Sequence, residues 1–452
     1  MLRLPPTIQE LHKSYTRHHL TPMEVTRFIL DQGAASHPSL NAFLQFTAER
    51  ALQEARRAET KLREGSQEPF LGVPYHVKDM FDVRGLVTTG ASEAGLDRPP
   101  AQEDAAVVRA LSPRGGILMG KTHLLEFAYG ETHPRFGFTR NPWNPSHSTG
   151  GSTTGGAAAV AAGLGYVAIG TDTGGSIRLP ASYCGLVGLK PTYGVLPTEG
   201  MTFLSPSLDH IGFLTRSAAD MARVWDAVRP RHKPITPDLG SLPSLRVAVL
   251  EEAWSGVAPE VEALLPEALA ILRDLHGQVV GEVSLSLESR IPPLLAILAA
   301  EASWVHRENF QRAPGLYSQG LQKRLKAGSQ IPAVSYLQAL EEKRRFALEL
   351  RDVFKDRGVD LLLLPTSPTG AHSLEEEVPD RDFTPYVLRT GPFNLAGTPA
   401  LSLRAGFTAG GLPLGLQWVA PWGREDLLLR LAYAYERATP GVQARKPPGA
   451  LF

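Results

Sequence analysis

A turn rich in glycine and hydroxyl groups, GTDTGGS at residues 170–176, contains the residue types that nucleophilic catalysis by serine requires. It follows the apolar run YVAI, which is typical of a buried strand. Gly174 and Gly175 lack side chains, so the backbone can curl until successive N–H groups point to one position. We interpret Ser176 as a candidate nucleophile, with its own N–H and those of Thr173 and the two glycines donating to a tetrahedral oxyanion. A purely structural tight turn is the alternative.

A nucleophilic serine needs a base, and Lys78 is the candidate. It ends the apolar stretch GVPYHV, where burial would lower the pKa of its amine toward neutrality. Side chains alternate along a strand, so Asp79 should point to the opposite face and His76 should share the face of Lys78. We hypothesise that His76 tunes Lys78 or contacts the substrate. A surface ion pair between Lys78 and Asp79 is the alternative interpretation.

Three other motifs compete with this interpretation. GGILMGKT at 115–122 fits the P-loop pattern, but its apolar centre is strand-like where a phosphate-binding loop is needed. GLGYVA at 163–168 follows a helical segment and precedes a strand, which reverses the order of a dinucleotide-binding motif. Asp209 and His210 follow Ser207, yet no G-x-S-x-G elbow accompanies them. A nucleotide-binding or catalytically silent protein remains the alternative from a different functional class.

The composition excludes several functional classes. Lysine plus arginine and aspartate plus glutamate both number 46, so no overall field attracts nucleic acid or acidic membranes. The single cysteine, Cys184, excludes an internal disulfide framework and is compatible with a reducing compartment. The segment 149–171 is uncharged, but glycine, alanine, serine and threonine dominate it, so it is a poor membrane span. The N-terminus shows no signal peptide, and we expect a cytoplasmic location.

The alternation of short apolar runs with helical segments predicts an α/β fold with a central mixed, largely parallel twisted sheet covered by helices. Ligands of such sheets bind beyond the carboxyl ends of strands, where Lys78 and Ser176 both fall. Predicted strands include 72–77, 116–119, 166–169, 360–365, 399–407 and 412–420, and predicted helices include 48–64, 105–111, 156–162, 336–354, 425–436 and one starting at the capping-box sequence TPME from Thr21.

We expect one large domain over residues 1–452, because the C-terminal strands alone are too few for an independent core. Four parts follow from the changes in sequence pattern. They are an N-terminal helical part at 1–66, a core at 67–228, a variable and mostly helical excursion at 229–334, and a C-terminal part at 335–452 that completes the sheet.

Several blocks together resemble the amidase signature enzymes. They are GVPYHVKDMFDVRGLVTT, NPWNPSHSTGGSTTGGAAAVAAG, GTDTGGSIRLPASYCGLVGLKPTYG, SLDHIGFLTRS, DLLLLPTSPTGA, FNLAGTPALSLRAGF and GLPLGLQWVAP. The resemblance covers most of the chain and is poorest from about residue 229 to 334. It implies a Lys78–Ser152–Ser176 set, with a cis peptide bond between Gly151 and Ser152. The two serines are 24 positions apart, as in the family's pattern.

The resemblance also implies roles for the residues around this set. Asp172 and Arg178 flank the nucleophile, and we expect them to hold the turn by pairing with each other. Thr153 keeps a hydroxyl of the family's GGSSGGS motif, whereas Thr154 replaces a glycine and must avoid positive φ or accept strain. Other departures are Gly156 at a usual serine position and His76 at a usual small residue. Phe127 and Tyr129 could line the site, with core packing favoured for Phe127.

The predicted function is hydrolysis of a carboxamide C–N bond through an acyl-enzyme on Ser176, with Ser152 and Lys78 relaying the proton. The resemblance implies no metal or organic cofactor, a small amide as substrate, and no direct partner among nucleic acids or membranes; a homodimer is left open. The alternative within the family is the glutamine-hydrolysing component of a tRNA-dependent amidotransferase, which would need partner subunits.

Overall fold

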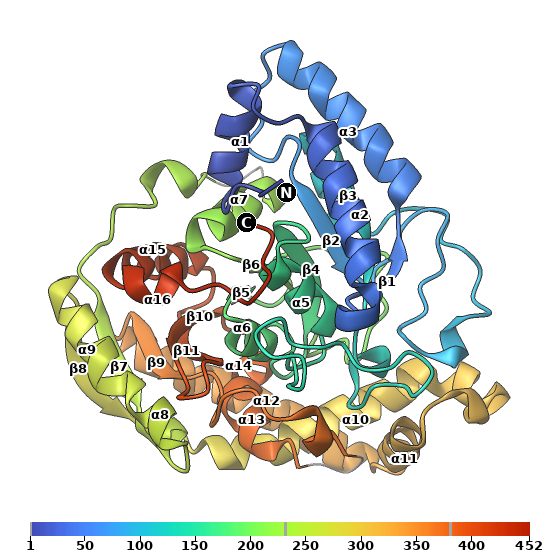
Figure 1. The fold of residues 1–452 in the computed structure, drawn as a ribbon. Coiled ribbons are helices and arrows are strands. Elements are labelled where there is room, and N and C mark those ends of the chain that lie inside the picture. Colours follow the sequence, from blue (N-terminus) through green and yellow to red (C-terminus); the bar gives the residue numbers. More distant parts are fainter. Residues whose placement is uncertain (1, 230–232, 379–381) are drawn as a thin grey trace.

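One twisted sheet runs through the protein and carries helices on both faces (Figure 1). The structure is a computed structural model and describes residues 2–229, 233–378 and 382–452. The strand order is β1-β3-β2-β4-β6-β5-β10-β11-β9-β7-β8. The strands are β1 Phe43–Phe46, β2 Pro74–Lys78, β3 Ile117–Thr122, β4 Val167–Asp172, β5 Val187–Lys190, β6 His210–Thr215, β7 Arg246–Leu250, β8 Gln278–Val283, β9 Leu361–Pro365, β10 Ala400–Phe407 and β11 Pro413–Val419.

The sheet is mixed, as predicted, but it is not largely parallel. Strands β3, β2 and β4 pair in parallel near one edge, and β9, β7 and β8 do so at the other. All pairings from β4 through β6, β5, β10 and β11 to β9 are antiparallel. The C-terminal strands enter the sheet as the hairpin β10–β11, and two strands joined by a short turn must run antiparallel. The predicted α/β domain is confirmed with this correction to the strand directions.

The helices that the sequence predicted form at the expected positions, with ends that differ by a few residues, and the structure adds others. Helix α2 starts at the capping box, in which Thr21 accepts from the Glu24 N–H and the Glu24 carboxylate accepts from the Thr21 N–H. The helices are α1 Ile8–Thr16, α2 Pro22–Leu40, α3 Ala48–Arg63, α4 Ala106–Leu111, α5 Thr154–Ala162, α6 Arg178–Cys184, α7 Ala218–Val228, α8 Pro259–Glu262, α9 Leu264–Asp274, α10 Leu287–Arg312, α11 Gln319–Gly328, α12 Ala333–Lys355, α13 Thr384–Thr390, α14 Pro392–Leu395, α15 Glu425–Ala438 and α16 Pro440–Ala444.

Alternation along β10 distributes side chains to two layers of helices. Leu401 and Leu403 pack in the large apolar core together with Leu428 and Leu431 of α15. The neighbouring residue Ser402 is buried and shares a hydrogen bond with Thr366 at the end of β9. Helix α6 packs on β5, β10 and β11, so the short helix after the turn at residues 172–177 rests on the centre of the sheet.

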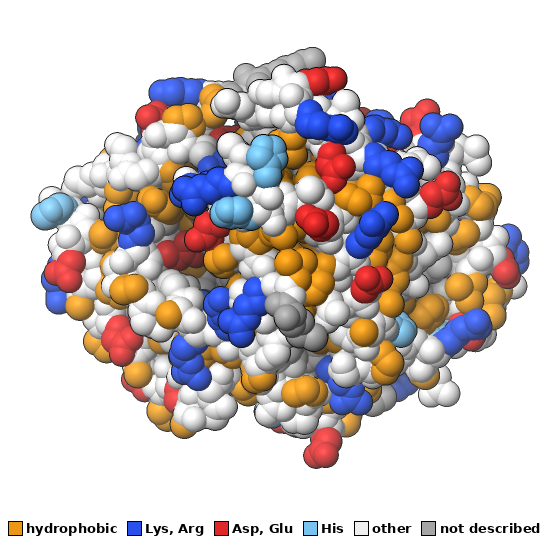
Figure 2. Space-filling model, turned by 45° about the horizontal axis from the view of Figure 1, so that its top comes forward, with side chains coloured by type: hydrophobic (Ala, Val, Ile, Leu, Met, Phe, Trp, Pro, Cys, Tyr) orange, Lys and Arg blue, Asp and Glu red, His pale blue; other side chains and the backbone are white. Residues whose placement is uncertain are grey.

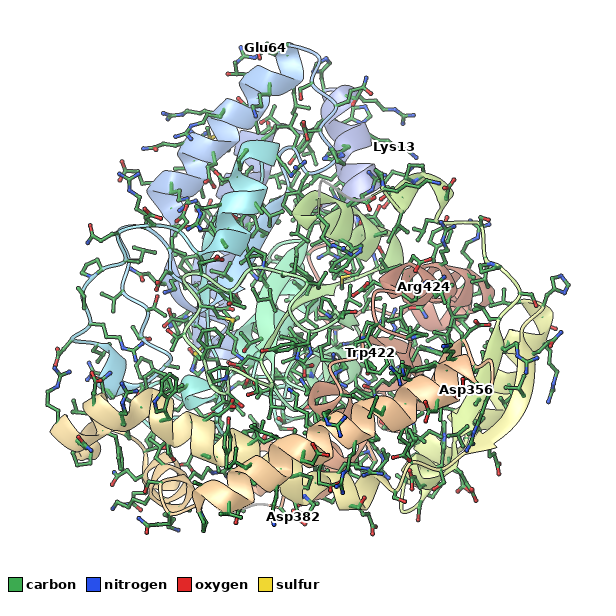
Figure 3. The ribbon with its side chains drawn as sticks, turned by 180° about the vertical axis from the view of Figure 1, so that it is seen from behind. Lys13, Glu64, Asp356, Asp382, Trp422 and Arg424 are labelled. Atoms are coloured by element: carbon green, nitrogen blue, oxygen red, sulfur yellow. The ribbon has the colours of Figure 1, made fainter. Side chains whose placement is uncertain are left out.

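The segment 229–334 supplies two strands as well as helices. Strands β7 and β8 extend the sheet beyond β9, which the sequence did not predict. The long helices α10 and α12 pack on each other along one side of the molecule (Figures 1 and 3). In the view from behind, Asp356 follows the end of α12, while Lys13 and Glu64 lie at the far end of the molecule (Figure 3).

Basic and acidic side chains are interspersed over the face shown in Figure 2. This agrees with the equal numbers of the two charge types in the sequence. Among the residues that the structure describes, no helix combines the length and the apolar character that a membrane crossing requires.

Close backbone contact positions the start of α5. A Cβ at Gly155 would lie 2.1 Å from the carbonyl oxygen of Ala42 and 2.5 Å from the amide nitrogen of His123. Neither is the flexible end of a side chain, so no local rotation relieves the overlap. Gly155 therefore sets the distance between α5 and the edge of the sheet.

We expect Gly155→Ala to lower the free energy of unfolding by about 1–3 kcal/mol, because the added methyl group overpacks a rigid contact. Gly441→Ala is the matched control, since a Cβ at Gly441 meets no atom within 4 Å; it should change stability by less than about 0.5 kcal/mol. Urea unfolding of both variants measures the difference. Equal stability of the two variants would show that the backbone contact at Gly155 is not tight.

Candidate active site

Lys78 lies at the carboxyl end of β2, beside the end of β4. Its side chain is fully buried, and its Nζ donates to Ser152 Oγ at 2.7 Å and to Thr171 Oγ1 at 2.8 Å. Strands β2 and β4 run in parallel with Val77 opposite Ile169, so the next residues of both strands reach the same edge of the sheet. The sheet therefore brings Lys78 to the serine at position 152, as the sequence predicted.

Burial controls the charge of the Lys78 amine. Removal from water lowers its pKa to about 7, and the carboxylates of Asp209 and then Asp172 oppose this shift. Asp79 points to the other face, where it lies 2.5 Å from Lys121 Nζ. The alternative of a surface ion pair between Lys78 and Asp79 is therefore wrong. Lys121, the lysine of the P-loop-like sequence, is a buried strand residue in this ion pair.

Ser152 and Ser176 line one cavity of about 280 Å³. The peptide bond between Gly151 and Ser152 is cis, at the position that the family resemblance implied. A Cβ at Gly151 would lie 2.4 Å from Leu125 Cδ1, so this position has no room for a side chain unless Leu125 moves. The Thr153 N–H donates to the Ser176 carbonyl oxygen at 3.3 Å, which connects the two serine-bearing segments.

The turn around Ser176 is organised by Asp172. Its carboxylate accepts from the backbone N–H groups of Gly175 and Ile177 and forms a 2.8 Å ion pair with Arg178. Burial alone would raise the pKa of Asp172. The charge and the hydrogen bonds of Arg178 outweigh this effect and hold the pKa well below its ordinary value. The Arg178 guanidinium also donates to Thr390 O and to the side chains of Asn394 and Gln417. The predicted pairing of Asp172 with Arg178 is thus present, and both residues are fully buried.

One predicted oxyanion donor needs correction. The Gly175 N–H already donates to Asp172 Oδ1 at 2.8 Å, so it is not free to bind a substrate oxygen. Gly175 has a φ of 130°, and a Cβ there would lie 2.4 Å from Thr390 Oγ1. Its role is to permit the turn. In the described part of the chain, no protein acceptor takes the N–H groups of Thr173, Gly174 or Ser176.

The hydroxyl of Thr173 has a separate partner behind the turn. It donates to Asp209 Oδ1 at 2.6 Å, and Asp209 Oδ2 accepts from the Leu204 and Ser205 N–H groups. Burial raises the pKa of Asp209 to about 6. Asp209 is therefore bound to the catalytic turn, and His210 hydrogen-bonds instead to the Leu208 carbonyl at 2.7 Å, so no serine triad forms there.

Of the two aromatic candidates, Tyr129 lines the cavity and Phe127 does not. Phe127 is fully buried against His306 and Tyr317, in agreement with the core packing favoured for it. The remaining walls are largely apolar. They comprise Leu125, Ala128, Gly130, Gly150, Gly151, Thr173, Gly174, Gly175, Leu179, Leu204, Ile291, Leu295, Leu298, Arg324, His372, Glu377, Phe383, Thr384, Tyr386, Val387 and Thr390.

The hypothesis for His76 is not supported. His76 packs edge-on against Phe43 at 5.4 Å, and a Cβ at Gly165 would lie 2.9 Å from its Nε2. It does not line the cavity, and Asp209 and Asp172 are the charged groups that act on the pKa of Lys78. Burial lowers the pKa of His76 to about 3, so the ring is neutral. His76 is therefore a buried residue of β2 that packs against Phe43.

The departures at positions 154 and 156 have local explanations. Thr154 is the first residue of α5 and has no positive φ, so it is not strained; its Oγ1 accepts from Thr139 Oγ1 at 3.2 Å. At Gly156 a Cβ would lie 2.9 Å from the Cβ of Ala168, which favours glycine over serine in this chain. Gly156 thus permits the close packing of α5 against β4, while Thr154 connects the start of α5 to Thr139.

Sequence reasoning missed several residues of the site. Thr171 could have been found, because strand alternation places it on the opposite face from Asp172, toward Lys78. Asn394 and Gln417, which bind Arg178, come from distant segments that no local pattern connects. Arg324 of the cavity wall lies in the segment 229–334, where the family resemblance is poorest. His372 follows directly after the block DLLLLPTSPTGA and belongs to no block that resembles the family.

Comparisons with known proteins agree with this geometry. A glutamyl-tRNA(Gln) amidotransferase subunit of Thermus thermophilus is 36% identical over 478 residues, covering 97% of this chain and 98% of the relative. The corresponding protein of Moorella thermoacetica is 36% identical, with 96% of each chain covered.

Among solved structures, a crystal structure of an amidase is similar at 33% identity with a TM-score of 0.85, covering 95% of this chain and 99% of the other. Peptide amidase from Stenotrophomonas maltophilia is 29% identical with a TM-score of 0.83, and 98% of each chain is covered. A family model described as Amidase matches residues 24–429. The chain therefore belongs to the Amidase family and is an enzyme of the type that acts on carbon–nitrogen bonds in amides.

Proposed function

We propose that this protein hydrolyses a carboxamide through an acyl-enzyme on Ser176, with Ser152 and Lys78 relaying the proton. The observation that carries the proposal is the 2.7 Å contact between Lys78 Nζ and Ser152 Oγ, beside a cavity that Ser176 also lines. Neutral lysine can act as a base, and burial lowers the pKa of Lys78 to about 7.

In the first step the Ser176 hydroxyl attacks the amide carbon while its proton passes to Ser152, whose own proton passes to Lys78. The resulting oxyanion binds among the N–H groups of Thr173, Gly174 and Ser176, which have no protein acceptor among the described residues. The proton returns from Lys78 through Ser152 to the leaving amine or ammonia, and the C–N bond breaks. Water then attacks the acyl-enzyme and releases the carboxylic acid.

A second candidate for the substrate is glutamine, with the chain acting as the glutaminase component of a tRNA-dependent amidotransferase. The curated relatives at 36% identity, which match nearly their whole length, carry the name of such an amidotransferase and favour this assignment. The chemistry at Ser176 would be the same, since glutamine carries a carboxamide. The ammonia would pass to a partner protein instead of entering solution.

The cavity offers a place for a substrate carboxylate. Arg324 lines it and stacks on Tyr129, with 5.5 Å from the guanidinium carbon to the ring centroid. No carboxylate of the described residues lies within ion-pair distance of Arg324. A charged amide such as glutamine would use this cation, whereas a neutral amide would contact the apolar walls and the other polar groups of the cavity.

Labelling tests the nucleophile. We expect a serine-directed phosphonate probe to modify Ser176, as mapped by peptide mass spectrometry, and Ser176→Ala to lose the label and lower kcat by at least about 10³-fold. Ser207→Ala is the matched control and should keep label and activity, because Ser207 lies outside the cavity and donates to Glu301. Label found on Ser207 or another residue would contradict the assignment.

The pH dependence tests the base. Since the pKa of Lys78 is lowered to about 7, the amine loses its proton near neutral pH, so kcat/KM should rise with pH through about 7 and then level off. Asp209→Asn should move this limb to lower pH, because the Asp209 carboxylate raises the pKa of Lys78. The Lys61→Met variant, at a half-buried lysine of α3 outside the cavity, should leave the profile unchanged. A limb unaffected by the loss of the Asp209 charge would argue against Lys78 as the base.

Substrate comparison separates the two assignments. If glutamine is the substrate, Arg324→Met should reduce its hydrolysis by about 10- to 100-fold, the loss expected for a charged hydrogen bond, and should spare butyramide. Lys326→Met on the same helix is the control, because Lys326 is exposed and does not line the cavity. Efficient butyramide turnover by the purified chain, with no glutamine hydrolysis, would contradict the glutaminase assignment while leaving the acyl-enzyme proposal intact.

A further inference from the structure

A second cavity of about 280 Å³ lies apart from the catalytic one and has no lining residue in common with it. It is enclosed by the C-terminal ends of α5 and α6, the turn before α7, β10, α15 and residues 443–452. Four arginines line it: Arg216, Arg404, Arg437 and Arg445. Such a concentration of guanidinium groups in one hollow differs from the interspersed charges seen over the surface (Figure 2).

Arg404 is the central observation. Its side chain is 8% exposed, and two of its nitrogens donate to the carbonyl oxygens of Arg445 and Gln443. The third nitrogen, Nε, is buried and has no hydrogen-bond acceptor among the described residues. The guanidinium also lies over the rings of Trp143 and Phe407, 5.7 and 5.6 Å from their centroids. Burial lowers the pKa of Arg404 to about 10, and the carboxylate of Glu436 opposes this shift.

No carboxylate of the cavity forms an ion pair with Arg404 among the described residues. Within the described residues, no carboxylate lies within ion-pair distance of Arg404, Arg437 or Arg445. Arg216 donates to the carbonyl oxygens of Pro6, Val160 and Gly165. Lys446 also lines the cavity, but its amine donates to the backbone oxygen of Phe452.

The one acidic side chain in the lining is Glu436. Its Oε2 accepts from the Ala218 N–H, which occupies that oxygen at the start of α7. Burial raises the pKa of Glu436 to about 8, so this carboxyl adds little negative charge at neutral pH. The cavity lining therefore has an excess of positive charge, and Arg404 adds a buried donor that no described residue satisfies.

We propose that this second cavity is a binding site for a small oxyanion, a ligand bearing phosphate or carboxylate groups, which Arg404 and Arg445 hold. The planar guanidinium of Arg445 matches the geometry of both anions through paired N–H donors, and Arg404, whose two terminal nitrogens already donate to residues 443 and 445, adds positive charge beside it. The volume admits inorganic phosphate or a small polycarboxylate and is near the lower limit of cavities that take larger organic ligands. The site does not depend on the proposed amidase mechanism, since it shares no residue with that cavity.

Isothermal titration of the whole chain with inorganic phosphate and, separately, with citrate tests the proposal, at constant ionic strength maintained with chloride. We expect one saturable site for at least one of the two anions, and Arg404→Met should weaken it by about 10- to 100-fold. The control is Arg351→Met, the same substitution at an exposed arginine of α12 outside the cavity, and it should retain the affinity. Which anion binds distinguishes phosphate from carboxylate chemistry.

A second variant keeps the test decisive if the loss of Arg404 disturbs folding. Arg445 is exposed, and Arg445→Met should weaken the same anion without lowering the melting temperature measured in chloride alone. Absence of a saturable site for both anions overturns the proposal. So does a site that survives both Arg404→Met and Arg445→Met, because the anion would then bind elsewhere on the protein.

Discussion

The buried pair of Asp172 and Arg178 is the interaction on which the turn that carries Ser176 depends. Asp172 accepts hydrogen bonds from the backbone of the turn, while Arg178 donates to groups on the C-terminal segments that carry Thr390, Asn394 and Gln417. Removing one partner of such a pair leaves a charge in the protein interior, which costs about 3–5 kcal/mol. The turn that presents Ser176 is therefore fixed by residues more than two hundred positions later in the chain.

Burial has opposite effects on the two ionisable groups that flank the turn. Desolvation raises the pKa of Asp209 and lowers that of Lys78, so each group is brought toward its neutral form. Their mutual attraction opposes both shifts and keeps the two values near neutrality. The pKa of Lys78 near 7 thus results from competition between desolvation and the carboxylates of Asp209, which is held by Thr173, and Asp172.

Local patterns predicted the elements better than their pairing. The apolar runs at 166–169 and 360–365 became β4 and β9, and the capping box started α2, because burial and capping act over a few residues. Strand direction depends on how distant segments meet, so the antiparallel centre of the sheet was not predicted. Strand β8 was missed because nearly all of its residues are exposed, which removes the apolar pattern that identifies a strand.

The site shows the same division. Alternation correctly separated Lys78 from Asp79, but it could not show that His76, on the face of Lys78, packs against Phe43 instead of the site. Residues 150–152 and 173–176 of the cavity lie in the segments that most resemble the family. Much of the remaining lining comes from α10, α11 and α13, which lie outside those segments. The proposed catalytic residues and most of the surrounding cavity wall thus come from different segments, so a resemblance strong enough to identify the family does not identify the amide.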